Sequence, residues 1–165
     1  MKRREILGSL LALPVVRAEP KPSVYLAGPL FSDAERSYLS QMAGVIRGAG
    51  FECFVPHEHP LPQPASAAYV FKLDRDALDK ATAMVAWVDG PDVDSGTACE
   101  IGLFSELCRR DPARKGVAAI ATDLRMTFRK ETPGGGMNLF VAGCIEATGV
   151  RVANVDAAVE WLRHR

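Results

Sequence analysis

The stretch Met84-Val-Ala-Trp-Val88, followed by Asp89-Gly-Pro-Asp-Val-Asp-Ser-Gly-Thr-Ala-Cys-Glu100, decides the fold of this chain. Its first five residues are apolar throughout, which is typical of a strand in the middle of a parallel sheet covered on both faces. The polar residues after it predict a loop, and a helix is expected over Thr97 to Arg109. The stretch therefore predicts a strand, a loop and a helix in succession, the repeating unit of an α/β protein.

The same alternation extends from this stretch toward both ends of the chain. Short apolar runs predict four further strands, at Ser23–Ala27, Phe51–Val55, Val117–Ala121 and Val150–Val152. Apolar residues at helical spacing predict further helices over Asp33–Arg47, Ala67–Lys80, Asn138–Glu146 and Asp156–Arg163. The pattern predicts one α/β domain, a doubly wound five-stranded parallel sheet with helices on both faces. The stretch from Thr122 to Gly136, with Pro133 and three consecutive glycines, is expected to be a mobile loop.

Composition and charge narrow the class of protein. The chain has 165 residues, of which 48% are apolar and 24% charged, as in one ordinary globular domain. Lys plus Arg and Asp plus Glu both number 20, so no basic surplus favours a nucleic-acid polymer or an anionic membrane as partner. The four cysteines form no C-x-x-C pair and the three histidines no H-x-x-x-H, so we expect no metal site.

The first 18 residues form a separate segment in front of the domain expected over residues 19–165. Three basic residues, Lys2, Arg3 and Arg4, precede an apolar run from Ile6 to Val16, an order that looks like a twin-arginine export signal. The run is too short for a stable membrane span. If the signal is genuine, the protein is periplasmic or exported. The alternatives are a start codon placed too far upstream, or a short amphipathic extension of a cytoplasmic protein.

The loops after the first and third strands are the places to look for a binding site. In a doubly wound sheet, ligands bind beyond the carboxyl ends of the strands. The loop and helix start after the third strand hold four acids between Asp89 and Glu100. Neither G-x-G-x-x-G after the first strand nor G-x-x-x-x-G-K-[ST] occurs, so a dinucleotide or P-loop triphosphate site is not supported. A nucleoside or sugar site remains open.

Several motifs at these positions carry a resemblance to a known family. They are Tyr25-Leu-Ala-Gly-Pro-Leu-Phe-Ser32, Asp74 ahead of the third strand, Asp94-Ser-Gly-Thr-Ala-Cys-Glu-Ile-Gly102 and Asn138-Leu-Phe140. From about Val24 to Leu162, the chain resembles the nucleoside 2-deoxyribosyltransferase family. The resemblance implies a flavodoxin-like fold, a homo-oligomer, no cofactor, and transfer of 2-deoxyribose between nucleobases as in nucleotide salvage.

The resemblance also implies a role for each matching residue. Glu100 would be the nucleophile that attacks the sugar. Asp74 and Asp94 would hold the base and handle its proton, and Tyr25 would orient the glutamate or the sugar. Asn138 would reach the site of a neighbouring subunit. Residues expected to bind substrate are Gly28, Pro29, Phe31, Ser95, Gly96 and Asn138.

The residue types suit this chemistry. A carboxylate stabilises the oxocarbenium-like state through which a glycosidic bond breaks, and can then bond to the anomeric carbon. The departing base needs a proton, and burial beside another carboxylate lets an acid such as Asp74 or Asp94 hold one near neutral pH. Gly28 and Gly96 allow the backbone to approach a ligand closely.

Each candidate also has a purely structural interpretation. Thr97-x-x-Glu100 has the spacing of a capping box, in which Glu100 would satisfy the Thr97 backbone N–H and take no part in chemistry. The other candidates could be cap, surface or core residues: Asp94 and Ser95 before a helix, Asp74 on a solvated helix face, Tyr25 in the core, and Asn138 as a helix cap.

Alternative functions follow from the same residues. An N-glycoside hydrolase acting on nucleosides or their 5′-monophosphates would use the same glutamate, with water in place of the second base. The basic residues Arg125, Arg129 and Lys130 leave a phosphate-bearing substrate possible. A non-catalytic nucleoside-binding domain would keep the pocket without the chemistry. A flavin-binding relative would be yellow when purified.

Overall fold

The chain folds around a five-stranded sheet with the strand order β2-β1-β3-β4-β5 and all neighbours parallel. The computed structural model describes residues 21–128 and 136–165. The strands are β1 (Ser23–Ala27), β2 (Glu52–Phe54), β3 (Ala83–Trp87), β4 (Gly116–Ile120) and β5 (Val150–Val152). The helices are α1 (Asp33–Gly48), the 3-10 turn η1 (Pro56–Glu58), α2 (Ala67–Lys80), α3 (Ser95–Arg110), α4 (Leu124–Phe128), α5 (Leu139–Thr148) and α6 (Val155–His164). The predicted doubly wound α/β fold is confirmed.

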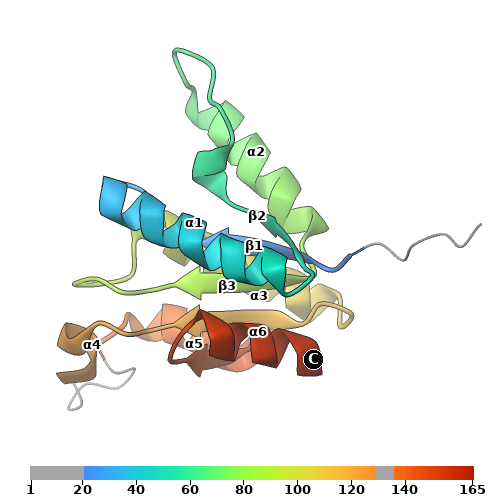
Figure 1. Ribbon diagram of the computed structural model, residues 1–165, viewed down its shortest axis with the longest axis vertical. Coiled ribbons are helices and arrows are strands. Elements are labelled where there is room, and N and C mark those ends of the chain that lie inside the picture. The colour runs from blue at the N-terminus through green and yellow to red at the C-terminus, as the bar shows by residue number, and fades with distance from the viewer. Residues whose placement is uncertain (1–20, 129–135) are drawn as a thin grey trace, which may run out of the picture.

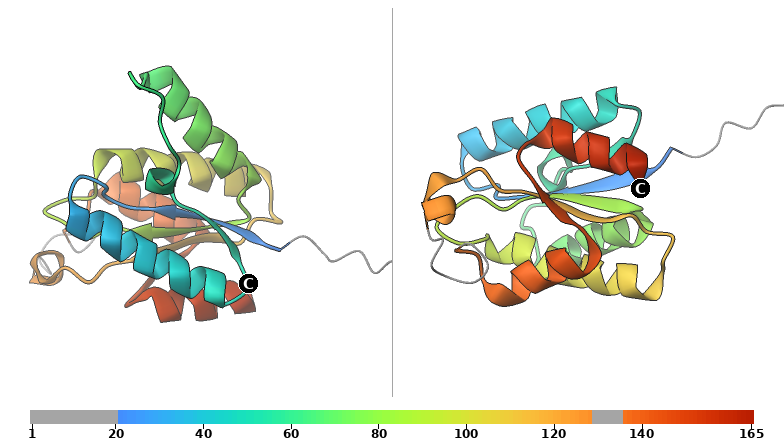
Figure 2. Two further views of the ribbon diagram at one scale, coloured as in Figure 1. Left: turned by 45° about the horizontal axis from the view of Figure 1, so that its top comes forward. Right: turned by 90° about the horizontal axis from the view of Figure 1, so that it is seen from below.

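Helices cover both faces of the sheet, so the protein has three layers (Figures 1 and 2). α1 and α6 pack on one face, and α2, α3 and α5 pack on the other. Successive residues of a strand point to opposite faces, so Val24 and Leu26 contact the first layer while Tyr25 and Ala27 contact the second. The side chains on both faces of the sheet are buried, which explains why the inner strands are apolar throughout.

The turn from β1 into α1 is fixed by local hydrogen bonds. The Ser32 side chain accepts a hydrogen bond from the Glu35 N–H at 3.2 Å, and the Glu35 carboxylate accepts one from the Ser32 N–H at 2.6 Å. Gly28 lies in the same turn, and a Cβ there would come within 2.9 Å of the Leu39 side chain. A glycine at this position therefore lets α1 pack closely behind β1.

Two predictions of local structure need correction. α3 begins at Ser95, two residues earlier than expected, because the Asp94 side chain caps it. α4 occupies part of the segment expected to be a loop: Asp123 Oδ1 accepts the Arg125 N–H at 2.8 Å, and the Met126 side chain is buried against the α3 and α5 layer. The rest of that expected loop, residues 129–135, and the expected leader, residues 1–18, lie outside the described residues.

All four cysteines are free thiols. Among residues 21–128 and 136–165, no helix has the length and apolar character needed to cross a membrane.

Candidate active site

A cavity of about 280 Å³ lies beyond the carboxyl ends of β1 and β3, where the sequence predicted a site. Its walls come from the loop after β1, the start of α3, the first residue of η1 and one face of α2. The lining residues are Gly28, Leu30, Phe31, Pro56, Val70, Asp74, Asp94, Ser95, Gly96, Thr97 and Glu100. Three carboxylates, separated by up to 26 residues in the sequence, thus share one cavity.

Glu100 and Tyr25 are joined directly. The Tyr25 hydroxyl, on a fully buried side chain of β1, donates a hydrogen bond to Glu100 Oε1 at 2.6 Å. Burial and the charge of Glu100 raise the pKa of Tyr25 far above its ordinary range, so this hydroxyl remains a donor. The core interpretation of Tyr25 is therefore correct for its ring, but its hydroxyl belongs to the site.

Glu100 lies in an environment that opposes its ionisation. The pKa of Glu100 is raised to about 7, chiefly by burial; the Tyr25 hydrogen bond acts in the opposite direction, and the nearby charges of Asp74 and Asp94 add to the rise. A carboxyl group with such a pKa exchanges its proton near neutral pH, which is common for groups in active sites.

The capping-box interpretation of Glu100 is wrong. The Thr97 N–H donates to Asp94 Oδ2 at 2.9 Å, and the side chain of Glu100 bonds to Tyr25 instead. The reason is the earlier start of α3, which makes Asp94 the N-cap and places Thr97 at the third helical position. Asp94 is thus a helix cap, as its structural interpretation held, and it also lines the cavity.

Asp74 differs from the other acids of α2. Asp76 and Asp79 form ion pairs with a basic residue four positions away, as expected for a solvated helix face. Asp74 is half-buried and lines the cavity, one turn after Val70. Burial raises the pKa of Asp74, although the nearby His59 lowers it. The surface interpretation therefore does not hold for Asp74.

The remaining predicted residues divide into two groups. Gly28, Ser95, Gly96 and Phe31 line the cavity, and Phe31 stands at its rim with 80% of its surface exposed. Pro29 is buried and is not one of the lining residues. Asn138 is exposed and caps α5, its Oδ1 accepting the Phe140 N–H at 2.9 Å. It does not line this cavity, so its reach into a neighbouring subunit stays a prediction.

Some residues of the cavity wall were not predicted. Leu30, Pro56, Val70 and Thr97 line it without having been singled out. Two of them carried a signal: Val70 precedes Asp74 by four positions and so shares its helix face, and Pro56 follows a strand at the same edge of the sheet.

Two further cavities adjoin the first around Asp74. One of about 430 Å³ shares Leu30, Pro56, Val70 and Asp74 with it and reaches His57 and His59. One of about 160 Å³ shares Asp74, Gly96 and Glu100. The acids therefore face a larger space than the first cavity alone. Within the described parts of the chain, no group of three or more His, Cys, Asp or Glu side chains could hold a metal ion.

Solved structures of other proteins share the fold of this chain. A search of curated proteins found no match. Similar solved structures include a 2-deoxyribosyltransferase from Bacillus psychrosaccharolyticus, with 20% identity, a TM-score of 0.60 and coverage of 83% of this chain and 90% of that one. A 2-desoxiribosyltransferase from Leishmania mexicana has 18% identity, a TM-score of 0.64 and coverage of 88% and 99%. A CMP N-glycosidase from Clostridium botulinum has 16% identity, a TM-score of 0.54 and coverage of 86% and 98%.

These structures show a shared fold. The sequence itself goes further, because residues 24–140 match the family model described as nucleoside 2-deoxyribosyltransferase, and they include Tyr25, Asp74, Asp94 and Glu100. The match spans well over half of the chain, and the chain belongs to the nucleoside 2-deoxyribosyltransferase family.

Proposed function

We propose that this protein transfers 2-deoxyribose from one nucleobase to another by double displacement, with Glu100 as the nucleophile. The observation that carries the proposal is the Glu100 carboxyl group, held by the Tyr25 hydroxyl at 2.6 Å, in a cavity that Asp74 and Asp94 also line. The family to which the chain belongs supports the same reaction.

In the first displacement, a Glu100 oxygen bonds to the anomeric carbon of the deoxynucleoside as the bond between that carbon and the base nitrogen breaks. Tyr25 occupies Oε1, so Oε2 is the oxygen free to attack. The electrons of the broken bond go to the base nitrogen. In the second displacement, a nitrogen of the incoming base attacks the same carbon, releases the Glu100 carboxylate and gives its proton to Asp74, which donated one in the first step.

Asp74 is the group suited to handle the proton of the base. Its burial raises its pKa, which makes it a better proton donor to the departing base than an ordinary exposed aspartate. It also faces both the 280 Å³ cavity and the adjoining 430 Å³ cavity, which give room for a base. Asp94 has Oδ2 engaged by Thr97, which leaves Oδ1 to accept a hydrogen bond from substrate.

Hydrolysis of an N-glycosidic bond is the second candidate. It is supported by the fold shared with the Clostridium botulinum CMP N-glycosidase, and it needs only water in place of the second base. A phosphate-bearing substrate gains no support from Arg125, whose guanidinium binds the Asp123 carboxylate. Arg129 and Lys130 lie outside the described residues.

Product analysis separates these candidates. Purified protein is incubated with deoxyadenosine, with and without free cytosine, and the products are separated by chromatography. The wild type is compared with Glu100→Gln and with Glu106→Gln, a matched control on the same helix whose carboxylate is exposed and bound to Arg109 and Arg110.

Each outcome has a distinct meaning. Deoxycytidine that forms only with cytosine, persists in Glu106→Gln and is lost in Glu100→Gln supports transfer through Glu100. Free adenine without a new nucleoside indicates hydrolysis. Binding of nucleosides without turnover, unchanged by Glu100→Gln, would favour a non-catalytic binding domain and contradict the proposal.

A further inference from the structure

The Tyr25 ring belongs to a stack of three rings. It lies parallel to the Phe54 ring, with centroids 5.3 Å apart and planes 24° apart. Phe54 also stacks on the His59 ring, with centroids 4.3 Å apart and planes 14° apart. Tyr25 and Phe54 are paired residues of the parallel strands β1 and β2, so the sheet register itself brings their rings together. We call Tyr25, Phe54 and His59 the ring stack.

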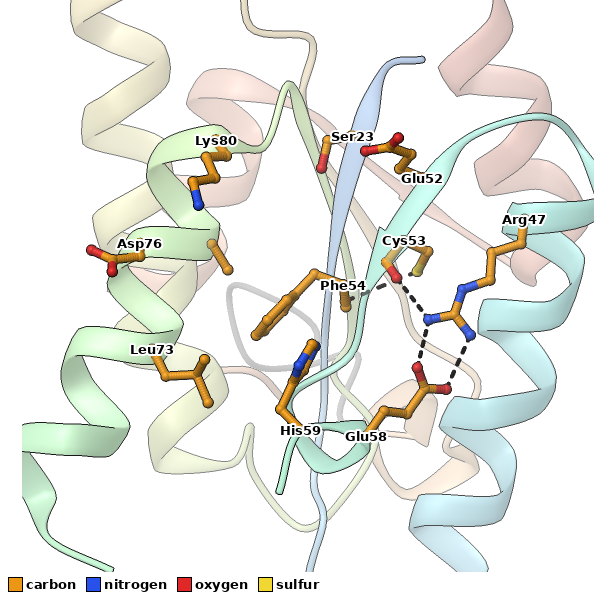
Figure 3. A pocket seen from close by; sticks show the side chains of 11 residues that line it. Ser23, Arg47, Glu52, Cys53, Phe54, Glu58, His59, Leu73, Asp76 and Lys80 are labelled. Carbon is orange, nitrogen blue, oxygen red and sulfur yellow. Dashed lines mark hydrogen bonds and ion pairs between the residues drawn. The ribbon is translucent and has the colours of Figure 1, made fainter. Parts of the chain in front are cut away.

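The outer part of the ring stack is anchored to α1. Arg47 of α1 binds both oxygens of the Glu58 carboxylate, at 3.1 and 2.5 Å, and donates to the Cys53 carbonyl at 2.7 Å. Cys53 precedes Phe54 and Glu58 precedes His59, so one guanidinium bonds to the backbone next to Phe54 and to the side chain next to His59 (Figure 3). Such bidentate pairing gives a defined geometry.

The ring stack separates the candidate site from a second hollow. A groove of about 530 Å³ lies between β2 and α2, and Phe54 and His59 line it whereas Tyr25 and Glu100 do not (Figure 3). β2 has three residues and lies at the edge of the sheet, with β1 as its strand neighbour. The Tyr25 ring therefore packs against a short edge strand, whose Phe54 side chain is held by stacking on its neighbours.

We propose that Phe54, backed by His59, is a positioning residue that holds the Tyr25 hydroxyl against Glu100. The flat face of Phe54 limits tilting of the Tyr25 ring, and a hydrogen bond of 2.6 Å between groups on two different elements tolerates little displacement. Phe54 acts on Glu100 through Tyr25, which stacks on Phe54 and donates to Glu100. The catalytic consequence rests on the proposed function of Glu100.

A double-mutant cycle tests whether Phe54 acts through Tyr25. Phe54→Leu keeps an apolar side chain but removes the flat face, and it is made in the wild type and in Tyr25→Phe. We expect kcat to fall about tenfold in the wild type, with KM changed less than about twofold, and to fall less than about twofold in Tyr25→Phe. Equal losses of kcat in both backgrounds would mean that Phe54 is only structural, and would overturn the proposal.

Phe51→Leu is the matched control for this cycle. Phe51 lies three residues before Phe54, but its side chain is buried on the opposite face of the sheet, with α1 and α6. The same substitution there costs packing without touching the ring stack. We expect it to change kcat by a similar factor in the two backgrounds.

A second readout does not depend on turnover. The pKa of Glu100 is measured by NMR titration of the ¹³C-labelled Glu side-chain carboxyls, with the Glu100 signal assigned from Glu100→Gln. The Tyr25 hydrogen bond lowers this pKa, so Phe54→Leu is expected to raise it in the wild type and leave it unchanged in Tyr25→Phe. If wild-type protein shows no turnover, the proposed function fails, while this titration still tests the role of Phe54. An unchanged Glu100 pKa in Phe54→Leu would overturn the proposal that Phe54 positions Tyr25.

Discussion

Two acids near the carboxyl ends of neighbouring strands are each bonded to an aromatic side chain, and they differ in how many donors surround them. Trp87, the last residue of β3, donates from Nε1 to Asp89 Oδ2 at 2.9 Å, as Tyr25 of β1 donates to Glu100. Asp89 also accepts from the Thr122 N–H, the Thr122 hydroxyl and the Asp123 N–H. Among the described residues, Glu100 accepts a hydrogen bond from one donor, Tyr25, and the other groups that shift its pKa are the acids Asp74 and Asp94.

The number of donors distinguishes Asp89, a structural acid, from Glu100, the candidate reactive acid. Four donors occupy both oxygens of Asp89, so it ties the loop after β3 to the segment after β4. Glu100 keeps one oxygen without such a partner, and burial beside Asp74 and Asp94 raises its pKa to about 7. A carboxylate with few hydrogen-bond donors is poorly stabilised, so it is more basic and more nucleophilic than a carboxylate whose oxygens both accept several hydrogen bonds.

The largest expected effect comes from exchanging these two acids for amides. Glu100→Gln is expected to lower kcat by at least about a thousandfold, because the nucleophile is lost. Asp89→Asn is expected to lower kcat less than about tenfold but to lower the free energy of unfolding by about 1–3 kcal/mol, since the neutral amide cannot accept hydrogen bonds from all four exposed or part-buried donors. Steady-state kinetics and urea unfolding of both variants provide the measurement. A comparable loss of kcat in Glu100→Gln and Asp89→Asn would contradict the assignment of one acid to catalysis and the other to structure.

A smaller effect is expected from the donor to Glu100. Tyr25→Phe is expected to lower kcat about tenfold to a hundredfold at neutral pH, because the carboxylate loses its orientation. It also removes the bond that lowers the pKa of Glu100, so the acid limb of the kcat/KM profile moves to higher pH and part of the loss is recovered there. An unshifted limb would show that the Tyr25 hydroxyl does not act on Glu100 ionisation.

Much of the fold could be predicted because it depends on local patterns. Apolar runs such as residues 84–88 have the composition that a strand buried on both faces requires, and the alternation with helices then limits the topology. α4 was missed because Asp123 and Met126 stabilise a short helix through a local cap and a distant buried contact, while the glycines beyond it favoured a loop.

The candidate site was predictable in its residues but not in its bonds. Asp94 and Glu100 follow the predicted third strand, and the family motif points to Glu100. The partner of Glu100 lies 75 positions away, however, and only the sheet brings Tyr25 beneath α3. The capping-box interpretation failed for the same reason: spacing alone could not show that Asp94 would start the helix earlier. Phe54 was not singled out because its role depends on strand register.

The smallest expected effect concerns stability and has the opposite sign to the loss of activity. The pKa of Glu100 is about 7 in the folded protein against 4.5 without the fold, so its proton is held more tightly when folded. The stability that this adds is present below pH 4.5 and is lost as the pH rises through 7. With a reduction for solvent screening, we expect the free energy of unfolding of Glu100→Gln to exceed that of the wild type by about 2 kcal/mol at pH 8. Near pH 4 we expect the two free energies of unfolding to be equal.

Urea unfolding at the two pH values measures this difference, and Glu106→Gln provides a control of opposite sign. Hydrogen bonds from Arg109 and Arg110 lower the pKa of Glu106, so its stabilising effect is present at pH 8 and fades as the pH falls. If Glu100→Gln were no more stable than wild type at pH 8, the ionised Glu100 would have to be compensated as fully as Asp89 is by its donors. The two acids would then not differ in how well their ionised carboxylates are stabilised. The reactivity assigned to Glu100 would need another explanation.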